Sequence, residues 1–129
     1  MTDSIFFVAR NGTPSNNLQN GQTLSTMAIT TFLQGQTILG FGAAEREATG
    51  VAYTRGTVIR RDGRLTTGTG IMSNLIVSSN RGRPGDSGGT TATITLATAG
   101  IIIGGPANGS ETFFMPAYRV LDALRVNRY

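Results

Sequence analysis

A short glycine-rich segment carries the residue types that acyl transfer needs. Residues 85–89 read Gly-Asp-Ser-Gly-Gly, so the hydroxyl of Ser87 has small neighbours on both sides. Attack on a carbonyl needs an exposed nucleophilic oxygen and backbone N–H groups aimed at the developing oxyanion. Gly85 tolerates a positive φ, so a tight turn can direct its N–H and that of Ser87 the same way. The segment predicts a nucleophile with an oxyanion hole, although the same composition is also typical of an ordinary turn.

The base that would activate Ser87 is missing from this sequence. The chain has no histidine and no cysteine, and all eleven of its basic residues are arginine, which also excludes a serine–lysine pair. A serine hydroxyl is a weak nucleophile until a neighbouring base takes its proton. Seven carboxylates and the α-amino group remain, and no spacing argues that one of them serves Ser87. We therefore expect no catalysis by these residues alone.

Composition limits the other kinds of chemistry. Without cysteine there is no disulfide or thiolate site, and without histidine only scattered carboxylates are left as metal ligands, so we expect no metal and no cofactor. No apolar run approaches the roughly 20 residues of a membrane span, and a soluble chain is expected. The net charge is +4, but only Arg60, Arg61 and Arg64 are grouped. A solvated hairpin end explains them better than a phosphate site, so nucleic acid is not an expected partner.

The elements that must position the segment 85–89 are mostly β-strands. Short apolar runs alternate with Gly, Asn and Asp, and 18 of the 129 residues are glycine, which is typical of an all-β barrel or sandwich. Asp62 and Gly63 suit a hairpin turn. One helix is expected after Pro116, with Arg125 near its end. Strands are expected at residues 4–9, 23–33, 37–41, 50–59, 65–71, 75–78, 90–96, 99–103 and 111–115.

The first third of the chain differs from the rest. Residues 11–21 carry one apolar side chain and are typical of a linker. Residues 5–8 read Ile-Phe-Phe-Val and must be buried against the body of the protein or against a partner chain. We therefore divide the chain into an N-terminal arm and linker, residues 1–34, and a barrel, residues 35–129.

From residue 50 onward, motifs occur in a fixed order. They are Gly-Thr-Val-Ile at 56–59, the segment 85–89, Gly-Ile-Ile-Ile-Gly-Gly at 100–105, and Phe-Phe-Met-Pro at 113–116 before the expected helix. This order resembles the C-terminal barrel of the chymotrypsin-fold, trypsin-like serine peptidases, the bacterial members most of all. The resemblance implies a single six-stranded antiparallel Greek-key barrel with a short C-terminal helix. It covers residues 35–129, and in the family the histidine and aspartate of the triad lie on another, N-terminal barrel.

The resemblance assigns roles to several residues. Ser87 would be the nucleophile, and the N–H groups of Gly85 and Ser87 the oxyanion hole. Ile103, Gly104 and Gly105 would form the wall that faces the substrate.

The resemblance also suggests roles for charged residues, on weaker grounds. Arg81 matches the floor of the specificity pocket, where it would favour an acidic or polar side chain, unless it is simply an exposed loop charge. The resemblance also implies that Asp86 turns inward, because an unpaired buried carboxylate costs several kcal/mol. Arg46 would be its ion-pair partner, or else part of a solvated cluster at residues 45–47.

Three functions remain open at this stage. The first is the nucleophile-bearing half of a serine endopeptidase that cleaves peptide substrates when a second polypeptide supplies histidine and aspartate. The second is a non-catalytic pseudo-peptidase that binds ligands and pairs with its own copy. A third reading is an assembly protein with residues 1–34 as an exchangeable arm. If it follows its relatives, the protein is secreted after processing.

Overall fold

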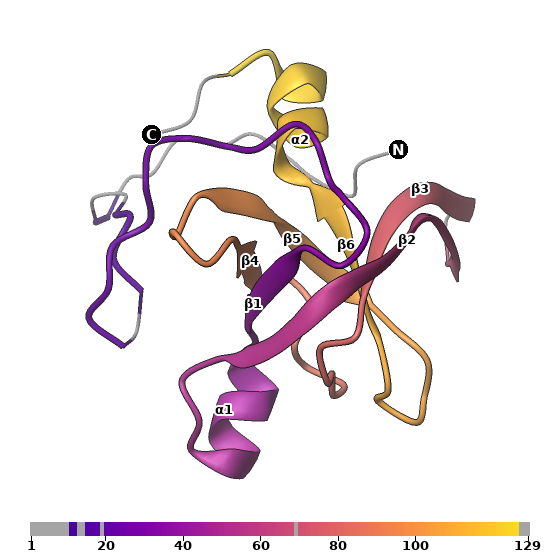
Figure 1. The fold of residues 1–129 in the computed structure, drawn as a ribbon, viewed down its shortest axis with the longest axis horizontal. Coiled ribbons are helices and arrows are strands. Elements are labelled where there is room, and N and C mark those ends of the chain that lie inside the picture. The colour runs from indigo at the N-terminus through magenta and orange to yellow at the C-terminus, as the bar shows by residue number, and fades with distance from the viewer. Residues whose placement is uncertain (1–10, 13–14, 19, 69, 127–129) are drawn as a thin grey trace.

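The structure, a computed structural model, describes residues 11–12, 15–18, 20–68 and 70–126. Strands dominate it, with a helix at each end of the sheet ring (Figure 1). In chain order the elements are β1 (Thr37–Phe41), α1 (Ala43–Thr49), β2 (Thr54–Thr67), β3 (Gly70–Ser78), β4 (Thr90–Ala92), β5 (Thr98–Gly104), β6 (Thr112–Pro116) and α2 (Ala117–Leu124). Among the described segments, neither helix has the length and apolar character needed to cross a bilayer.

The six strands close into a barrel. Their order around the ring is β1, β2, β3, β6, β5, β4, and every neighbouring pair is antiparallel. The predicted six-stranded antiparallel barrel with a C-terminal helix is confirmed. The connection from β3 to β4, residues 79–89, must cross from one side of β1 and β2 to the other. This long crossing connection carries Ser87.

Two groups of apolar side chains fill the barrel. One surrounds Phe114 and includes Ile38 and Val58, and the other contains Met72 and Leu75; all five are at most 1% exposed. β-branched and aromatic side chains alternate inward from neighbouring strands, which is how a small barrel excludes water. The barrel interior is therefore a packed core that holds the loops at its ends in place.

Part of the segment assigned to the arm packs on this barrel. Phe32 is 4% exposed and meets Phe114 edge to face, with ring centroids 5.8 Å apart. The N–H of Ile29 donates to the carbonyl of Thr98, and the N–H of Thr98 donates to that of Met27. Residues 23–33 were predicted as a strand, but the structure has only isolated β-bridges there. The segment makes individual backbone hydrogen bonds to the start of β5 and does not form a continuous strand pairing. The predicted strand 4–9 lies outside the described residues.

The predicted hairpin turn at Asp62 and Gly63 is wrong. Both residues lie inside β2, and the turn between β2 and β3 falls between Thr67 and Gly70. Asp-Gly favours a tight turn locally, but continuing the strand lets Leu65 pair with β3 beside the core. Gly63 instead pairs with Leu75 of β3, between two register shifts of the ladder.

Gly63 has no room for a side chain. A Cβ at this position would lie 2.5 Å from Val77 Cγ2 and 3.0 Å from the carbonyl oxygen of Leu75. Gly63→Ala is expected to lower the free energy of unfolding by about 1–3 kcal/mol, since the packed strand must shift to admit a methyl group. Urea denaturation measures this change. Gly68→Ala is the matched control, because no heavy atom lies within 4 Å of its added Cβ; equal losses in the two variants would contradict the prediction.

The helix α1 was not predicted. Its sequence, Ala-Ala-Glu-Arg-Glu-Ala-Thr, contains strong helix formers, and Gly50 ends it with φ of 74° in the left-handed region. Seven residues make a helix too short to form alone. The contacts that hold it come from the loop that carries Ser87.

Candidate active site

The loop that carries Ser87 is fastened to the neighbouring strand β5. The N–H of Gly88 donates to the carbonyl of Ile102 at 2.8 Å, and the N–H of Ile102 returns a bond of 2.8 Å to the carbonyl of Gly89. Gly85 and Gly88 have φ values of 98° and 89°, which side chains rarely adopt. The glycines of the segment 85–89 therefore set the path of the loop.

Asp86 anchors the loop to α1. The side chain is 5% exposed, and each carboxylate oxygen accepts a backbone N–H at 2.8 Å, Oδ1 from Glu45 and Oδ2 from Arg83. The first of these donors belongs to the first turn of α1, where N–H groups have no partner within the helix. A Cβ on Gly42 would overlap Asp86 Cγ, so Gly42 has to be a glycine for the carboxylate to reach the helix. The anchor links two segments some forty residues apart.

An ion pair lies on the solvent side of the hydrogen bonds made by Asp86. Arg83 Nε lies 2.6 Å from Glu45 Oε2, and the Glu45 side chain is almost wholly covered while that of Arg83 is 45% exposed. Neither residue was predicted at the site; the position of Arg83 three residues before Asp86 was the only signal. Arg46 lines the same side of the loop as Asp86. The Arg46–Asp86 ion pair stays a prediction.

Ser87 lies exposed at the tip of the loop. Its hydroxyl has no hydrogen-bond partner among the described residues, and the same holds for the backbone N–H groups of Gly85 and Ser87. The nearest carboxylate in sequence, that of Asp86, has both oxygens occupied by backbone donors. Three hydrogen-bond donors are thus left open to a ligand at one place.

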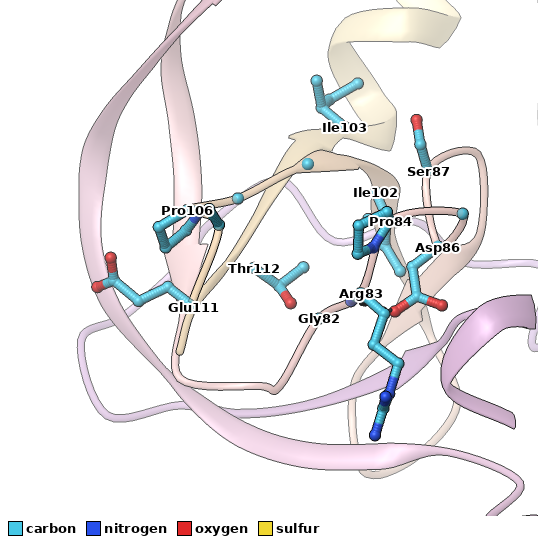
Figure 2. Close-up of a pocket in the computed structure, with 14 residues that line it drawn as sticks. Gly82, Arg83, Pro84, Asp86, Ser87, Ile102, Ile103, Pro106, Glu111 and Thr112 are labelled. Carbon is cyan, nitrogen blue, oxygen red and sulfur yellow. Dashed lines mark hydrogen bonds between the residues drawn. The ribbon is translucent and has the colours of Figure 1, made fainter. Parts of the chain in front are cut away.

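A hollow of about 200 Å³ lies beside Ser87 along β5, and we call it the β5 hollow. The predicted wall residues 103–105 line it together with Gly85, and Thr112 lies at its centre (Figure 2). The Arg83 side chain extends away from Ser87, toward α1. The other lining residues are Gly82, Arg83, Pro84, Asp86, Ile102, Pro106, Ala107 and Glu111.

The charged residues near the β5 hollow are compensated. Glu111 at its far end is paired with Arg60, with 3.1 Å between Oε2 and Nη1. Arg81 is not among the lining residues; it is exposed and borders a separate hollow with Tyr53 and Arg55. The structure therefore brings the predicted wall to Ser87 but places Arg81 elsewhere.

A second hollow, of about 400 Å³, lies on the α1 side of Ser87, and we call it the α1 hollow. Phe41, Ala43, Arg46 and Leu18 line it, with the loop 85–90 as one wall. Ser87 stands between the two hollows. No group of three His, Cys, Asp or Glu residues that could hold a metal occurs in the described part of the chain.

Solved structures with the same fold are serine proteases. A glutamic acid specific serine protease superposes with a TM-score of 0.75 at 23% identity, over 94% of this chain and 64% of that one. Cellulomonas bogoriensis chymotrypsin gives 0.71 at 23% identity, over 88% and 60%. Thermobifida fusca Protease A gives 0.67 at 24%, over 86% and 57%. No protein-family model and no curated protein matches the sequence.

These likenesses define the fold as one barrel of the chymotrypsin type. The chain spans less than two thirds of the length of each of the three solved structures. A fold of this kind can carry many activities, so function has to be argued from the site.

Proposed function

We propose that this chain supplies the nucleophile, the oxyanion donors and the substrate hollow of a serine endopeptidase, while polypeptide outside this sequence supplies the base and the carboxylate that orients it. One observation carries the proposal. The Ser87 hydroxyl is exposed and has no partner among the described residues, it lies between two hollows, and its loop is fixed to α1 by the bond from the Glu45 N–H to Asp86. A turn with no function has no need of this arrangement.

The chemistry divides between the two hollows. One side chain of the peptide enters the β5 hollow, and Ser87 Oγ attacks the backbone carbonyl carbon of that same residue. The hydroxyl proton passes to a base seated in the α1 hollow, and the N–H groups of Gly85 and Ser87 stabilise the oxyanion. The C–N bond breaks, the base returns the proton to the leaving amine, and water hydrolyses the acyl ester by the same route.

The β5 hollow favours a medium-sized apolar side chain. Glycine, proline, alanine and isoleucine make up most of its wall, and the hydroxyl of Thr112 is already donated to the carbonyl of Asn80 at 2.9 Å. Glu111 is neutralised by Arg60. Arg81 lies outside the hollow, and Arg83, which does line it, is paired with Glu45, so no unpaired cation among the lining residues supports the acidic preference expected from the sequence.

Labelling with a fluorophosphonate tests the proposal. The chain alone should react slowly, and a co-purifying polypeptide that carries histidine, or added imidazole, should raise the rate about a hundredfold, since a general base contributes on the order of 10²–10⁴. Mass spectrometry should place the label on Ser87. Ser87→Ala should remain unlabelled, while Ser73→Ala, on the exposed part of β3, should react as the original chain does. No labelling with partner or imidazole would sink the proposal.

One observation favours a second candidate, a binding module without catalysis. Arg46 and Asp86 are the only ionisable side chains that line the α1 hollow among the described residues, and neither is a base for Ser87. Such a module would pair with a second copy of itself rather than with a base-bearing chain. It predicts a stable homo-oligomer and no fluorophosphonate adduct.

A further inference from the structure

We propose that a third hollow, separate from the two beside Ser87, binds a phosphate monoester. This hollow has a volume of about 500 Å³ and lies between the start of α2, the strands β2 and β3, and residues 30–32. We call it the arginine hollow, because Arg61 and Arg119 both line it. No described residue lines both the arginine hollow and a hollow beside Ser87, so the inference does not rest on the proposed peptidase function.

A β-bulge in β2 places Arg61 at the arginine hollow. Residues 61 and 62 of β2 together oppose the single residue Ile76 of β3. A bulge of this kind can re-aim a side chain out of the regular alternation of a strand. Arg61 Nη1 donates to the carbonyl of Phe32 at 2.9 Å, and its Nε and Nη2 have no acceptor among the described residues. The guanidinium is thus held in place while most of its donors stay available.

A second bulge, in β3, holds Arg119. Ser73 and Asn74 together oppose the single residue Arg64 of β2, and Asn74 has a φ of 56°, which asparagine tolerates better than most residues. Arg119 Nη1 donates to the carbonyl of Asn74 at 2.9 Å and to that of Ser73 at 3.3 Å. Its Nε and Nη2 also have no acceptor in the part of the chain that the structure describes. Both arginines are therefore positioned before any ligand arrives.

The positive charge at the arginine hollow is not compensated by the described residues. No Asp or Glu is among the lining residues, and none of the ion pairs between described residues includes Arg61 or Arg119. Arg119 lies in the first turn of α2, which has no acidic residue and where the helix dipole disfavours a cation. Asp122 in the same helix is exposed and does not line the hollow. An anion between the two arginines would remove this cost.

The donors and the wall of the arginine hollow together suit a phosphate monoester. A guanidinium binds two oxygens of a phosphate through parallel N–H bonds, and two guanidiniums match the charge of about −1.5 to −2 that a monoester carries at pH 7. Buried Phe32, Ile76 and Pro116 offer apolar surface to the carbon skeleton of the ester. Thr30 and Thr31 add exposed hydroxyl groups. The volume is in the range of small-molecule sites, about 300–1,000 Å³, and exceeds what a bare phosphate ion fills.

A nucleic acid strand suits this surface less well. Surfaces that bind single strands combine a groove of cations along the backbone with aromatic rings on which the bases stack. The described aromatic residues that line the arginine hollow are Phe32, which is 4% exposed, and Tyr118, which packs against the core group around Phe114. Neither ring is free to stack on a base, and the two arginines gather at one hollow.

Isothermal titration calorimetry with phenyl phosphate at pH 7.5 and low salt tests the inference. We expect a dissociation constant of about 1 mM or lower, which is reasonable for a ligand of this size. Phenyl sulfate has a similar shape and one charge less, so it should bind about three- to tenfold more weakly. Phenol should show no binding. Backbone amide NMR signals should shift in residues 30–32, 73–76 and 117–119 and stay unchanged in residues 85–89.

Arginine variants test the two guanidiniums. Arg61→Gln and Arg119→Gln should each weaken phenyl phosphate binding by about tenfold or more, since each removes charge-assisted hydrogen bonds. Arg119→Lys keeps the charge without the planar fork and should recover only part of the loss. Arg55→Gln is the matched control, because Arg55 is exposed on β2 outside the hollow and its loss changes the net charge equally. It should change the affinity by less than about twofold.

Two further ligands identify the source of the phosphate and the rival partner. A tripeptide Ala-phosphotyrosine-Ala that binds as tightly as phenyl phosphate would support an ester on a polypeptide side chain, and weaker binding would support a free small molecule. A thymidine decanucleotide that binds more tightly than both, and loses affinity in the same variants, would overturn the inference in favour of a nucleic acid surface.

The inference would also be overturned by an absence of phenyl phosphate binding, by equal affinity for phenyl sulfate, or by NMR shifts outside the arginine hollow. Equal losses in Arg55→Gln and Arg119→Gln would mean that only net charge matters. Fluorophosphonate labelling of Ser87 is read separately and should be the same in the arginine variants as in the original chain. Failure of that labelling would remove the peptidase proposal and leave phosphate binding intact.

Discussion

Asp86→Ala is expected to lower the free energy of unfolding by about 2–4 kcal/mol, because it leaves the buried N–H groups of Glu45 and Arg83 without an acceptor. The lost hydrogen bonds join α1 to the Ser87 loop, so both segments should become less stable. Urea denaturation gives the global change. Hydrogen exchange should show faster exchange in residues 43–49 and 83–89 before the barrel strands respond.

The control for this variant is Asp62→Ala, which removes an exposed carboxylate from β2. Surface substitutions of this kind usually change stability by less than about 0.5 kcal/mol. Asp86→Ala should also lose most of its fluorophosphonate labelling at Ser87 under conditions in which it is still folded. An Asp86→Ala variant as stable as Asp62→Ala would show that the two backbone bonds are not the anchor described above.

Phe114→Ala is expected to lower the free energy of unfolding by about 3–5 kcal/mol, which is the usual loss when a large buried aromatic side chain is removed. Phe114 is fully buried, lies on β6 and packs edge to face against Phe32. The variant loses the ring contact with Phe32 and the packing within the group that contains Ile38 and Val58. For a domain with a typical stability of about 5–15 kcal/mol, a large part of the total would be gone.

Tyr53→Ala provides the aromatic comparison. Tyr53 is 38% exposed and pairs with Phe41, with ring centroids 5.5 Å apart, outside the two core groups. Its loss should stay near 1 kcal/mol, the contribution typical of one aromatic pair. Thermal or urea denaturation of both variants measures the difference. Equal effects would mean that Phe114 is not central to the core.

The barrel could be predicted from the sequence because short local residue patterns indicate its strands. The apolar run of β5 is β-branched and lies between Gly100 and Gly104, and the Phe-Phe-Met-Pro run of β6 is short and mostly aromatic. The turn at Asp62 and Gly63 was wrong for the opposite reason. Its local signal was strong, but pairing along the whole length of β2 and β3 outweighed it.

The candidate site was predictable in part. The segment 85–89 was singled out from its residue types and the wall 103–105 from the resemblance to chymotrypsin-fold peptidases, and the structure places the two side by side. The helix α1 and the anchoring roles of Gly42 and Glu45 were not, because they depend on contacts between segments far apart in the chain. No periodicity or spacing encodes such a contact in a single sequence.

The closure of the strand ring has a consequence for how this protein can meet other molecules. An open sheet ends in two edge strands whose free N–H and C=O groups recruit further strands, a common first step of fibril growth. Here β1 pairs with β4 and completes the ring, so the six described strands present no full-length edge. Two kinds of open edge remain among the described residues: the short stretch of β5 past Ile102, and the far end of the β2–β3 hairpin, since β1 pairs only with residues 54–57 of β2 and β6 only with residues 76–78 of β3. The closure that limits polymerisation of the barrel thus leaves one of its short open edges next to Ser87.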